Sequence, residues 1–189
     1  MLLLASKSPR RRELLKMLDI PFKIVEVKDV DEIYPESLEC ESVPEYLSKL
    51  KASACNGIIM ENDILITADT VVIIDNEILG KPSDRDEAEE MLRQLSGRTH
   101  KVVTGVTLSS KEKAKSFSVK TDVTFADISD EEIKYYVEKY RPLDKAGAYG
   151  IQEWIGAVGI KCINGSFYNV MGLPVHKLYN ELKTMDKSI

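Results

Sequence analysis

The sequence predicts an α/β protein built around a mixed, twisted β-sheet with helices beside it. Two observations support this prediction. The residues from Ile64 to Ile74 are almost all apolar or β-branched, which is typical of a strand covered on both faces. Strand-like and helix-like segments alternate along the chain, yet some strand-like segments follow one another directly, so the sheet is expected to be mixed. With 43% hydrophobic and 30% charged residues the chain can bury an ordinary core, which excludes disordered and fibrous classes.

The N-terminal segment predicts two strands, a helix and a loop. Leu2 to Ala5 is expected to form a short buried strand. Ser8 caps the next helix and Pro9 is its first residue, since a hydroxyl satisfies backbone N–H groups there and proline has none to lose. Phe22 to Val27 predicts a second strand, and the acidic stretch from Asp29 to Glu39 a loop. The apolar face of the helix carries Leu14, Leu15 and Leu18.

The central part of the chain predicts two further helices around the apolar strand. The capping-box pattern from Ser42 to Glu45 marks the start of one helix. After the apolar strand, Asp75 to Glu77 turns the chain back into a short strand at Ile78 to Gly80. The other helix starts at Ser83 and ends at Gly97. The apolar face of the first of these helices is expected to carry Tyr46, Leu47, Leu50, Ala54 and Ile58.

The second half of the chain predicts two strands, two helices and, between the helices, a glycine-rich segment. Val102 to Leu108 is an apolar strand, and the alternation from Phe117 to Phe125 indicates a half-exposed antiparallel strand. A capping box at Ser129 opens a helix that stops before the next proline. The glycine-rich segment 146–172 is expected to combine loops with one or two short strands, and Val175 to Met185 closes the chain as an amphipathic helix.

Charge and composition limit the classes of partner. The net charge is −5, which disfavours a protein whose whole surface binds nucleic acid or an anionic membrane. An anionic ligand must therefore meet a local basic cluster, and one is present from Ser8 to Arg12. No segment approaches the ~20 apolar residues of a membrane span. Three cysteines without CxxC spacing predict reduced thiols in the cytoplasm, not a disulfide frame or a zinc site: Cys40, Cys55 and Cys162.

The chain is expected to form a single domain over residues 1–189. Its length is close to the rough prior of ~150 residues per domain. No linker, low-complexity segment or internal repeat is visible in the sequence. All candidate functional residues are therefore expected to belong to one folded body.

Asp69 is the most conspicuous polar residue, because it lies inside the apolar strand. A buried carboxylate is costly unless a metal, a cation or hydrogen bonds compensate its charge. Asp69 either marks a strand bend satisfied by backbone amides or belongs to a functional site, and burial alone does not choose between the two.

The start of the first helix has the features of a phosphate-binding site. A helix N-terminus presents unpaired N–H groups and a positive dipole potential, and here the hydroxyls of Ser6 and Ser8 precede it. The guanidinium groups of Arg10 to Arg12 follow, and their planar fork suits phosphate. Because cations in a first turn oppose the helix dipole, these arginines favour a functional role over helix stabilisation.

Two lysines and two histidines carry weaker signals. Lys81 follows a glycine in a tight turn, but the glycine of a Walker A motif upstream is missing and a proline follows Lys81. Taken alone, Lys81 and Lys51 are typical of solvated lysines. His100 and His176 lack metal-ligand spacing and are expected to be structural. What remains, carboxylates with lysine and arginine, suits metal-assisted hydrolysis of a phosphoanhydride.

Six blocks of the sequence together resemble the Maf family of nucleoside triphosphate pyrophosphatases. They run in the family's order and span nearly the whole chain. The blocks are LASKSPRRRELL at 4–15, ADTVV at 68–72, LGKP at 79–82, LSGRTHKVVTGV at 95–106, AGAYGIQ at 146–152 and INGSFYNVMGLP at 163–174.

The resemblance implies a fold related to the inosine triphosphatase superfamily, with a long curved mixed sheet flanked by helices and a substrate cleft between two lobes. It implies a divalent cation, Mg²⁺ or Mn²⁺, as cofactor and a homodimer as the assembly. It also implies a cytoplasmic housekeeping role, sometimes linked to restraint of septum formation. Neither nucleic acid nor a membrane is an expected partner.

The resemblance also implies catalytic and metal-binding residues. Asp69 of the ADT block corresponds to the catalytic base. Lys51 and Lys81 match lysines that bind the phosphates and assist catalysis. Glu32 matches an acidic position near the metal, which it would hold together with Asp69.

The remaining site residues implied by the resemblance bind phosphate or sort the base. Ser6, Ser8 and Arg11 lie near the phosphates, whereas Arg12 falls at a variable, surface position. The base is selected by three residues: Arg10, Thr70 and Gln152.

This last set resembles the branch of the family that hydrolyses dTTP and UTP. One glutamine amide can complement both uracil and thymine, because each base offers an N3–H donor beside a carbonyl acceptor. Two alternatives stay open. The same chemistry could act on 7-methyl-GTP or other modified nucleotides, or the protein could be a nucleotide-binding regulator of cell division without turnover.

Overall fold

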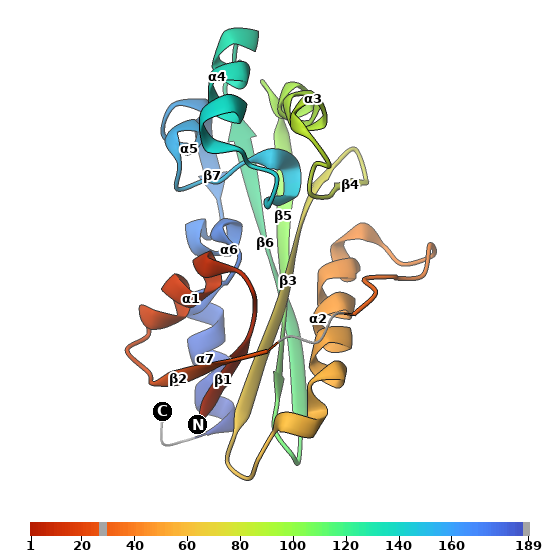
Figure 1. Ribbon diagram of the computed structural model, residues 1–189, viewed down its shortest axis with the longest axis vertical. Helices are drawn as coiled ribbons and strands as arrows, with labels where there is room; N and C mark the ends of the chain where they lie inside the picture. The colour runs from red at the N-terminus through yellow and green to blue at the C-terminus, as the bar shows by residue number, and fades with distance from the viewer. Residues whose placement is uncertain (27–29, 187–189) are drawn as a thin grey trace. The chain divides into compact units, whose positions relative to one another are not determined.

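The structure, a computed structural model, describes residues 1–26 and 30–186. Within these residues the strands are β1 Leu2–Ala5, β2 Phe22–Val25, β3 Ile64–Ile74, β4 Glu77–Leu79, β5 Thr99–Ser109, β6 Ala114–Phe125 and β7 Ile160–Asn164. They form one sheet in the order β2-β1-β3-β5-β6-β7, with β4 paired to β3 (Figure 1). β1 runs parallel to β2 and β3, whereas β4 is antiparallel to β3 and β7 to β6. The predicted mixed sheet is therefore confirmed.

Helices connect most of the strands. Those in the described residues are α1 Pro9–Lys16, α2 Val43–Ala54, α3 Arg85–Leu95, α4 Asp130–Tyr140, α5 Trp154–Gly159, α6 Phe167–Met171 and α7 Val175–Met185. Short 3-10 helices occur at η1 Cys40–Ser42, η2 Asn56–Ile58 and η3 Ala146–Ala148. None of the helices in the described part of the chain is both long and apolar enough to cross a bilayer.

Contacts between residues divide the chain into two units. The first unit comprises Met1–Thr70, Thr104–Val119 and Gly172–Ile189. The second unit comprises Val71–Val103 and Lys120–Met171. Three strands, β3, β5 and β6, contribute residues to both units.

In the first unit, helices cover both sides of β3. Figure 1 shows α2 on one side of this strand and α1 and α7 on the other. Because both faces are covered, nearly every β3 residue is buried, as the apolar composition predicts. The large apolar side chains that fill this unit include Leu4, Leu14, Leu15, Leu47, Leu65, Ile66, Leu178 and Leu182.

Several predicted caps and turns are confirmed. The Ser8 hydroxyl accepts a hydrogen bond from the backbone N of Arg11 at the start of α1. Ser129 forms the predicted capping box of α4 with Glu132. The turn between β3 and β4 has positive φ at Asp75 and Asn76, which is typical of a tight hairpin.

The predicted start of α2 at Ser42 is confirmed, but the predicted capping box does not form, and the predicted apolar face is buried only in part. Ser42 has a helical backbone and makes no capping hydrogen bond, because η1 runs directly into α2. Tyr46, expected on the apolar face, is 37% exposed, whereas Ser48 is fully buried. The helix also ends at Ala54, so Ile58 lies in η2. The buried face of α2 includes Ser48, which contacts hydroxyl groups of the sheet, and the spacing of hydrophobic residues does not reveal such a polar contact.

Other boundaries also differ from the prediction. α3 starts one residue later than expected. Its cap is Asp84 and not Ser83, and the Asp84 carboxylate accepts a hydrogen bond from the backbone N of Glu87. β2 ends at Val25, and Val27 of the predicted strand lies outside the described residues, as does Asp29 of the predicted loop. Segment 146–172 contains one strand, as allowed, but also α5 and α6, which its glycine content concealed.

The core of the second unit surrounds a buried histidine. His100 is 2% exposed, and its Nε2 lies 2.8 Å from the Tyr149 hydroxyl oxygen. Its ring also packs against Phe125, with centroids 5.5 Å apart. Burial lowers the pKa of His100 to about 4. This histidine is therefore neutral and structural, as the sequence predicts.

The low pKa of His100 predicts acid sensitivity of folding. The unfolded chain binds a proton near pH 6.5 and the folded chain only near pH 4, so stability is complete above pH 6.5 and falls as the pH drops toward 4. Between pH 7 and pH 5 this group alone costs about 2 kcal/mol of unfolding free energy. Urea unfolding at both pH values should show a smaller drop for His100→Gln than for the wild type. Equal drops would contradict the assignment.

Candidate active site

Three charged side chains meet at the middle of β3 in the first unit. The Nζ of Lys51, on α2, lies 2.5 Å from Oδ1 of Asp69 and 2.9 Å from Oε1 of Glu32. The side chains of Lys51 and Asp69 are only 13% and 12% exposed, whereas that of Glu32 is 53% exposed. The carboxylate of Asp69 is thus compensated by a cation inside a continuous strand, and its role in a functional site stays a prediction.

Hydroxyl groups fix the face of α2 that carries Lys51. Ser48 lies one helical turn before Lys51, and its backbone oxygen accepts a hydrogen bond of 2.7 Å from the Thr67 hydroxyl. The Ser48 hydroxyl lies 2.7 Å from that of Thr107 on β5, which in turn lies 2.9 Å from that of Ser116. These buried contacts hold α2 on the same face of β3 that presents Asp69.

Gly105 lets α2 approach the sheet at backbone distance. A Cβ at this position of β5 would lie 2.2 Å from the N and 2.4 Å from the Cα of Glu45, which real atoms do not reach. The first turn of α2 therefore rests directly on the strand. Neither Gly105 nor Ser48 carries a charge, and neither was predicted as a site residue. A glycine inside an apolar strand, such as Gly105, nevertheless indicates close approach of another backbone.

Thr70 points away from Asp69, because successive side chains of a strand lie on opposite faces. Its hydroxyl accepts a hydrogen bond of 3.0 Å from Nη2 of Arg11 and lies 3.0 Å from the hydroxyl of Thr104. The acid and the threonine of the ADT block thus contact different helices. Asp69 faces α2, and Thr70 faces α1.

Arg11 is held inside the first unit by three protein acceptors. Its Nη1 donates to Ala68 O at 2.8 Å, its Nε to Gly172 O at 2.8 Å and its Nη2 to Thr70. β1 pairs with β3 only as far as Ile66, so the guanidinium continues the hydrogen bonding of this edge where the strand has ended. Burial lowers the pKa of Arg11, and the charge of Asp69 opposes this shift.

Gly172 completes the surroundings of Arg11. Its φ is +117°, a conformation open to glycine, and its carbonyl accepts from Arg11. Three of the five N–H groups of Arg11 are thus bound to protein. This internal role was not predicted, although Arg11 precedes Leu14, Leu15 and Leu18 at helical spacing and therefore lies on the apolar face of α1.

The other residues of the basic segment lie around the start of α1. Ser6 is buried, and its hydroxyl accepts from the N of Ser8 at 3.2 Å. Arg10 is partly exposed. Arg12, predicted at the surface, is also only partly exposed, and among the described residues its buried Nε has no hydrogen-bond partner.

Lys81 and Gln152 belong to the second unit. Lys81 is exposed in the turn after β4, where the N of Gly147 donates to Gly80 O at 3.0 Å. Gln152 is exposed between the buried Ile151 and the partly buried Glu153. Both residues are exposed, so their side chains are accessible to a ligand.

The donor set suits a cation shared with a substrate. No group of three or more His, Cys, Asp or Glu side chains that could hold a metal occurs in residues 1–26 and 30–186. Glu32 and Asp69 nevertheless converge, since both reach the same Nζ of Lys51. Mg²⁺ is commonly held by one or two carboxylates together with substrate phosphates and water. These two carboxylates therefore fit a divalent cation that also binds a phosphate chain.

The fold of this chain is shared with known structures. Two solved structures share the fold: the Ham1 protein of Staphylococcus aureus, with a TM-score of 0.52 and 17% identity, and a HAM1 protein of Coxiella burnetii, with 0.55 and 15%. The alignments cover 95% and 97% of this chain and 98% of each structure. This likeness confirms the predicted fold class, a mixed sheet flanked by helices.

The chain belongs to the Maf family. The family model described as Maf-like protein matches residues 1–185. A relative from Porphyromonas gingivalis named dTTP/UTP pyrophosphatase is 59% identical over 189 residues, covering 99% of this chain and 95% of the relative. Relatives with the same name from Bacteroides thetaiotaomicron and Flavobacterium psychrophilum are 54% and 51% identical, and the alignments cover 97% and 94% of this chain and 95% and 91% of those proteins.

Proposed function

We propose that this protein is a nucleoside triphosphate pyrophosphatase that hydrolyses dTTP and UTP to the monophosphate and diphosphate. The observation that carries the proposal is the ion pair between Lys51 on α2 and Asp69 of the ADT block on β3. The names of relatives that are 59% and 54% identical over nearly the whole chain support the substrate class.

Asp69 activates the attacking water in this proposal. Its carboxylate accepts a proton as the water oxygen bonds to the α-phosphorus, and the bond from that phosphorus to the bridging oxygen breaks. Diphosphate leaves with the bridging oxygen, and the proton is released to solvent. The Lys51 ammonium, which compensates Asp69 in the free protein, is placed to neutralise phosphate charge when the triphosphate binds.

A divalent cation, Mg²⁺ or Mn²⁺, is the proposed cofactor. Glu32 and Asp69 would hold it, and it would supply charge neutralisation to the phosphate chain. Lys81 from the second unit, together with Ser6, Ser8 and Arg11 around α1, stays a predicted phosphate ligand. Because the Arg11 guanidinium already donates to Ala68 O and to the Thr70 hydroxyl, we propose that Arg11 also positions Thr70.

The decisive experiment incubates the purified protein with a panel of nucleoside triphosphates and Mg²⁺ or Mn²⁺ and identifies the products. Diphosphate with monophosphate is expected, with dTTP and UTP as the best substrates. Release of orthophosphate would contradict the proposed bond cleavage. The same panel separates the alternatives, because a preference for 7-methyl-GTP would show in the ranking, and a regulator without turnover would bind nucleotide and form no product.

Gln152 is predicted to select the base together with Arg10 and Thr70. Replacing Gln152 with alanine should change the ranking of dTTP and UTP against the other triphosphates by about tenfold or more, because one or two base hydrogen bonds are lost. The kcat with the best substrate should change less than the ranking. Comparison of kcat/KM across the panel checks this, and an unchanged ranking would exclude Gln152 as a selector.

The proposed assembly rests on the family resemblance alone, and the proposed location rests on that resemblance and on the cysteine pattern. A homodimer in the cytoplasm, folded as one domain over residues 1–189, stays a prediction, as does the cleft between two lobes. Light scattering of the purified protein tests the assembly.

A further inference from the structure

We propose that the ammonium group of Lys51 takes the place of the divalent cation between Glu32 and Asp69, so that a nucleotide must draw this lysine away before the cation binds tightly. The inference rests on the proposed function, in which the two carboxylates hold the cation and Lys51 meets the phosphates. It adds that metal and nucleotide are taken up together. All three residues lie in the first unit.

The Lys51 side chain itself contacts both carboxylates. Its Nζ lies 2.5 Å from Oδ1 of Asp69 and 2.9 Å from Oε1 of Glu32. These are the two carboxylates that fit a divalent cation. One positive charge therefore already lies on the oxygens that the cation would need.

A divalent cation and the ammonium repel each other at Asp69. Mg²⁺ binds its oxygen ligands at about 2.1 Å, so a cation on the oxygen that Lys51 contacts would lie within about 4.6 Å of Nζ, whichever side it approached from. The side chains of Lys51 and Asp69 are only 13% and 12% exposed, so water screens this repulsion poorly. The cation and the ammonium are thus alternatives at this carboxylate.

Lys51 can leave Asp69 without movement of its helix. The first turn of α2 rests on β5, where a Cβ at Gly105 would lie 2.2 Å from the N of Glu45. One turn before Lys51, the backbone oxygen of Ser48 accepts from the Thr67 hydroxyl at 2.7 Å. Because the backbone is held in this way, the ammonium moves by rotation about the bonds of its own side chain.

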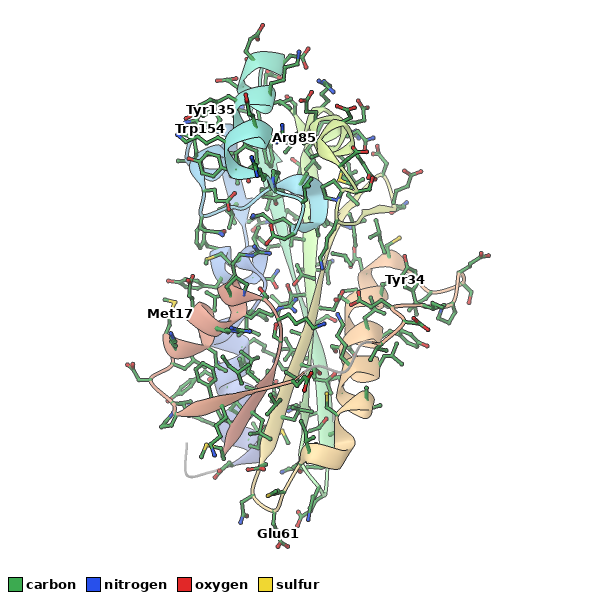
Figure 2. The ribbon with its side chains drawn as sticks, viewed as in Figure 1. Met17, Tyr34, Glu61, Arg85, Tyr135 and Trp154 are labelled. Carbon is green, nitrogen blue, oxygen red and sulfur yellow. The ribbon has the colours of Figure 1, made fainter. Side chains whose placement is uncertain are left out.

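A triphosphate supplies the anion that Lys51 needs in order to leave. Withdrawal from Asp69 without a new partner would strand a largely buried charge, which is costly. Phosphate oxygens can accept the ammonium, and they also add ligands to the cation. Glu32 can adjust to the cation, because its side chain is 53% exposed and lies in the loop between β2 and η1 that also carries Tyr34, labelled in Figure 2.

The first measurement uses Mn²⁺ alone, without nucleotide. Free Mn²⁺ is followed by its electron paramagnetic resonance signal as protein is added. Lys51→Met should bind Mn²⁺ about tenfold more tightly than the wild type, because the competing ammonium is gone. Lys49→Met is the matched control, since it removes the same charge from the same helix, but Lys49 is 54% exposed and pairs with Glu45. Its Kd for Mn²⁺ should equal that of the wild type.

A second pair of variants makes the test independent of one substitution. Lys51→Gln removes the charge and keeps an N–H donor for Asp69, which protects the fold, and it should bind Mn²⁺ as tightly as Lys51→Met. Adding Glu32→Gln to Lys51→Gln should cancel this gain, because Mn²⁺ loses one of its two carboxylates. Circular dichroism checks that each variant is folded. A gain that persists in the double variant would place Mn²⁺ elsewhere and overturn the inference.

The second measurement adds a UTP analogue that has a methylene group in place of the oxygen between the α- and β-phosphorus, so that it binds without cleavage. The analogue should lower the wild-type Kd for Mn²⁺ by about tenfold or more, after correction for Mn²⁺ bound by the analogue in solution. In Lys51→Met this factor should be about tenfold smaller, because Mn²⁺ no longer displaces an ammonium. An equal factor in both proteins would overturn the inference.

The inference and the proposed function fail in different ways. If the wild type forms no diphosphate, the proposed function fails, and titration of the wild type and Lys51→Met with Mn²⁺ alone still decides whether the ammonium excludes the cation. If diphosphate forms but both proteins bind Mn²⁺ alone with the same Kd, the inference is overturned and the proposed function stands.

Discussion

Replacing Asp69 with asparagine is expected to lower kcat about a thousandfold with dTTP or UTP, because an amide of the same shape cannot accept the proton of the attacking water. The substitution keeps the volume of the side chain, so the strand should stay packed. The kcat of the variant and of the wild type is measured from steady-state release of diphosphate at the same saturating concentration of the divalent metal. Full activity of Asp69→Asn would contradict the assigned role.

Loss of the ion pair with Lys51 must be separated from loss of the base. Lys51→Met also breaks the pair, and it leaves Asp69 in place. Asp75→Asn makes the same chemical change directly after the C-terminal end of β3, at an exposed position paired with Arg98. Circular dichroism and the Tm of all three variants show whether folding is retained. Asp75→Asn should keep wild-type kcat, which would assign the loss in Asp69→Asn to the site.

Gly105→Ala is expected to reduce the unfolding free energy by about 3 kcal/mol and to abolish most activity. The added methyl group would collide with the backbone of Glu45, which cannot rotate away as a side chain does. The first turn of α2 would have to move off β5, and Lys51, on the same helix, would leave Asp69. The unfolding free energy, measured with urea, and kcat should therefore fall together.

Gly57→Ala provides the matched control. Gly57 lies in η2, just after α2, and a Cβ there would meet nothing within 4 Å. This variant should be as stable and as active as the wild type, because the same methyl group fits in open space. Wild-type stability of Gly105→Ala would show that α2 does not depend on this close contact.

Hydrophobic periodicity predicted the helices and strands whose burial follows from their own sequence. β3 and α7 match their predicted bounds, because a doubly covered strand and an amphipathic helix each imprint their own period on the sequence. The face of α2 did not follow, because its buried Ser48 contacts hydroxyls on two strands that are distant in sequence. α5 was missed because Gly156 and Gly159 lower the helix propensity of a short segment that tertiary contact stabilises.

In the candidate site, too, some residues could be predicted from the local sequence and others could not. Asp69 could be found because a charge inside an apolar run is costly and so conspicuous. Its partner Lys51 could not be distinguished by its own surroundings, since a lysine on a helix is usually solvated, and only the resemblance singled it out. The contact of Glu32 with the same ammonium leaves no trace in the pattern either, because the fold brings together residues from a loop, a helix and a strand.

The division of β3, β5 and β6 between the two units has a practical consequence for gene fragments. The boundary falls between Thr70 and Val71, directly after the ADT residues Asp69 and Thr70, and each unit is assembled from segments that alternate along the chain. No single cut in the gene separates one unit from the other. A fragment that stops before Gly172 would lack α7 and the carbonyl that binds Arg11, although Asp69 is encoded about a hundred codons earlier. Truncation is therefore unsuited to dissecting this protein, and point variants are the appropriate tool.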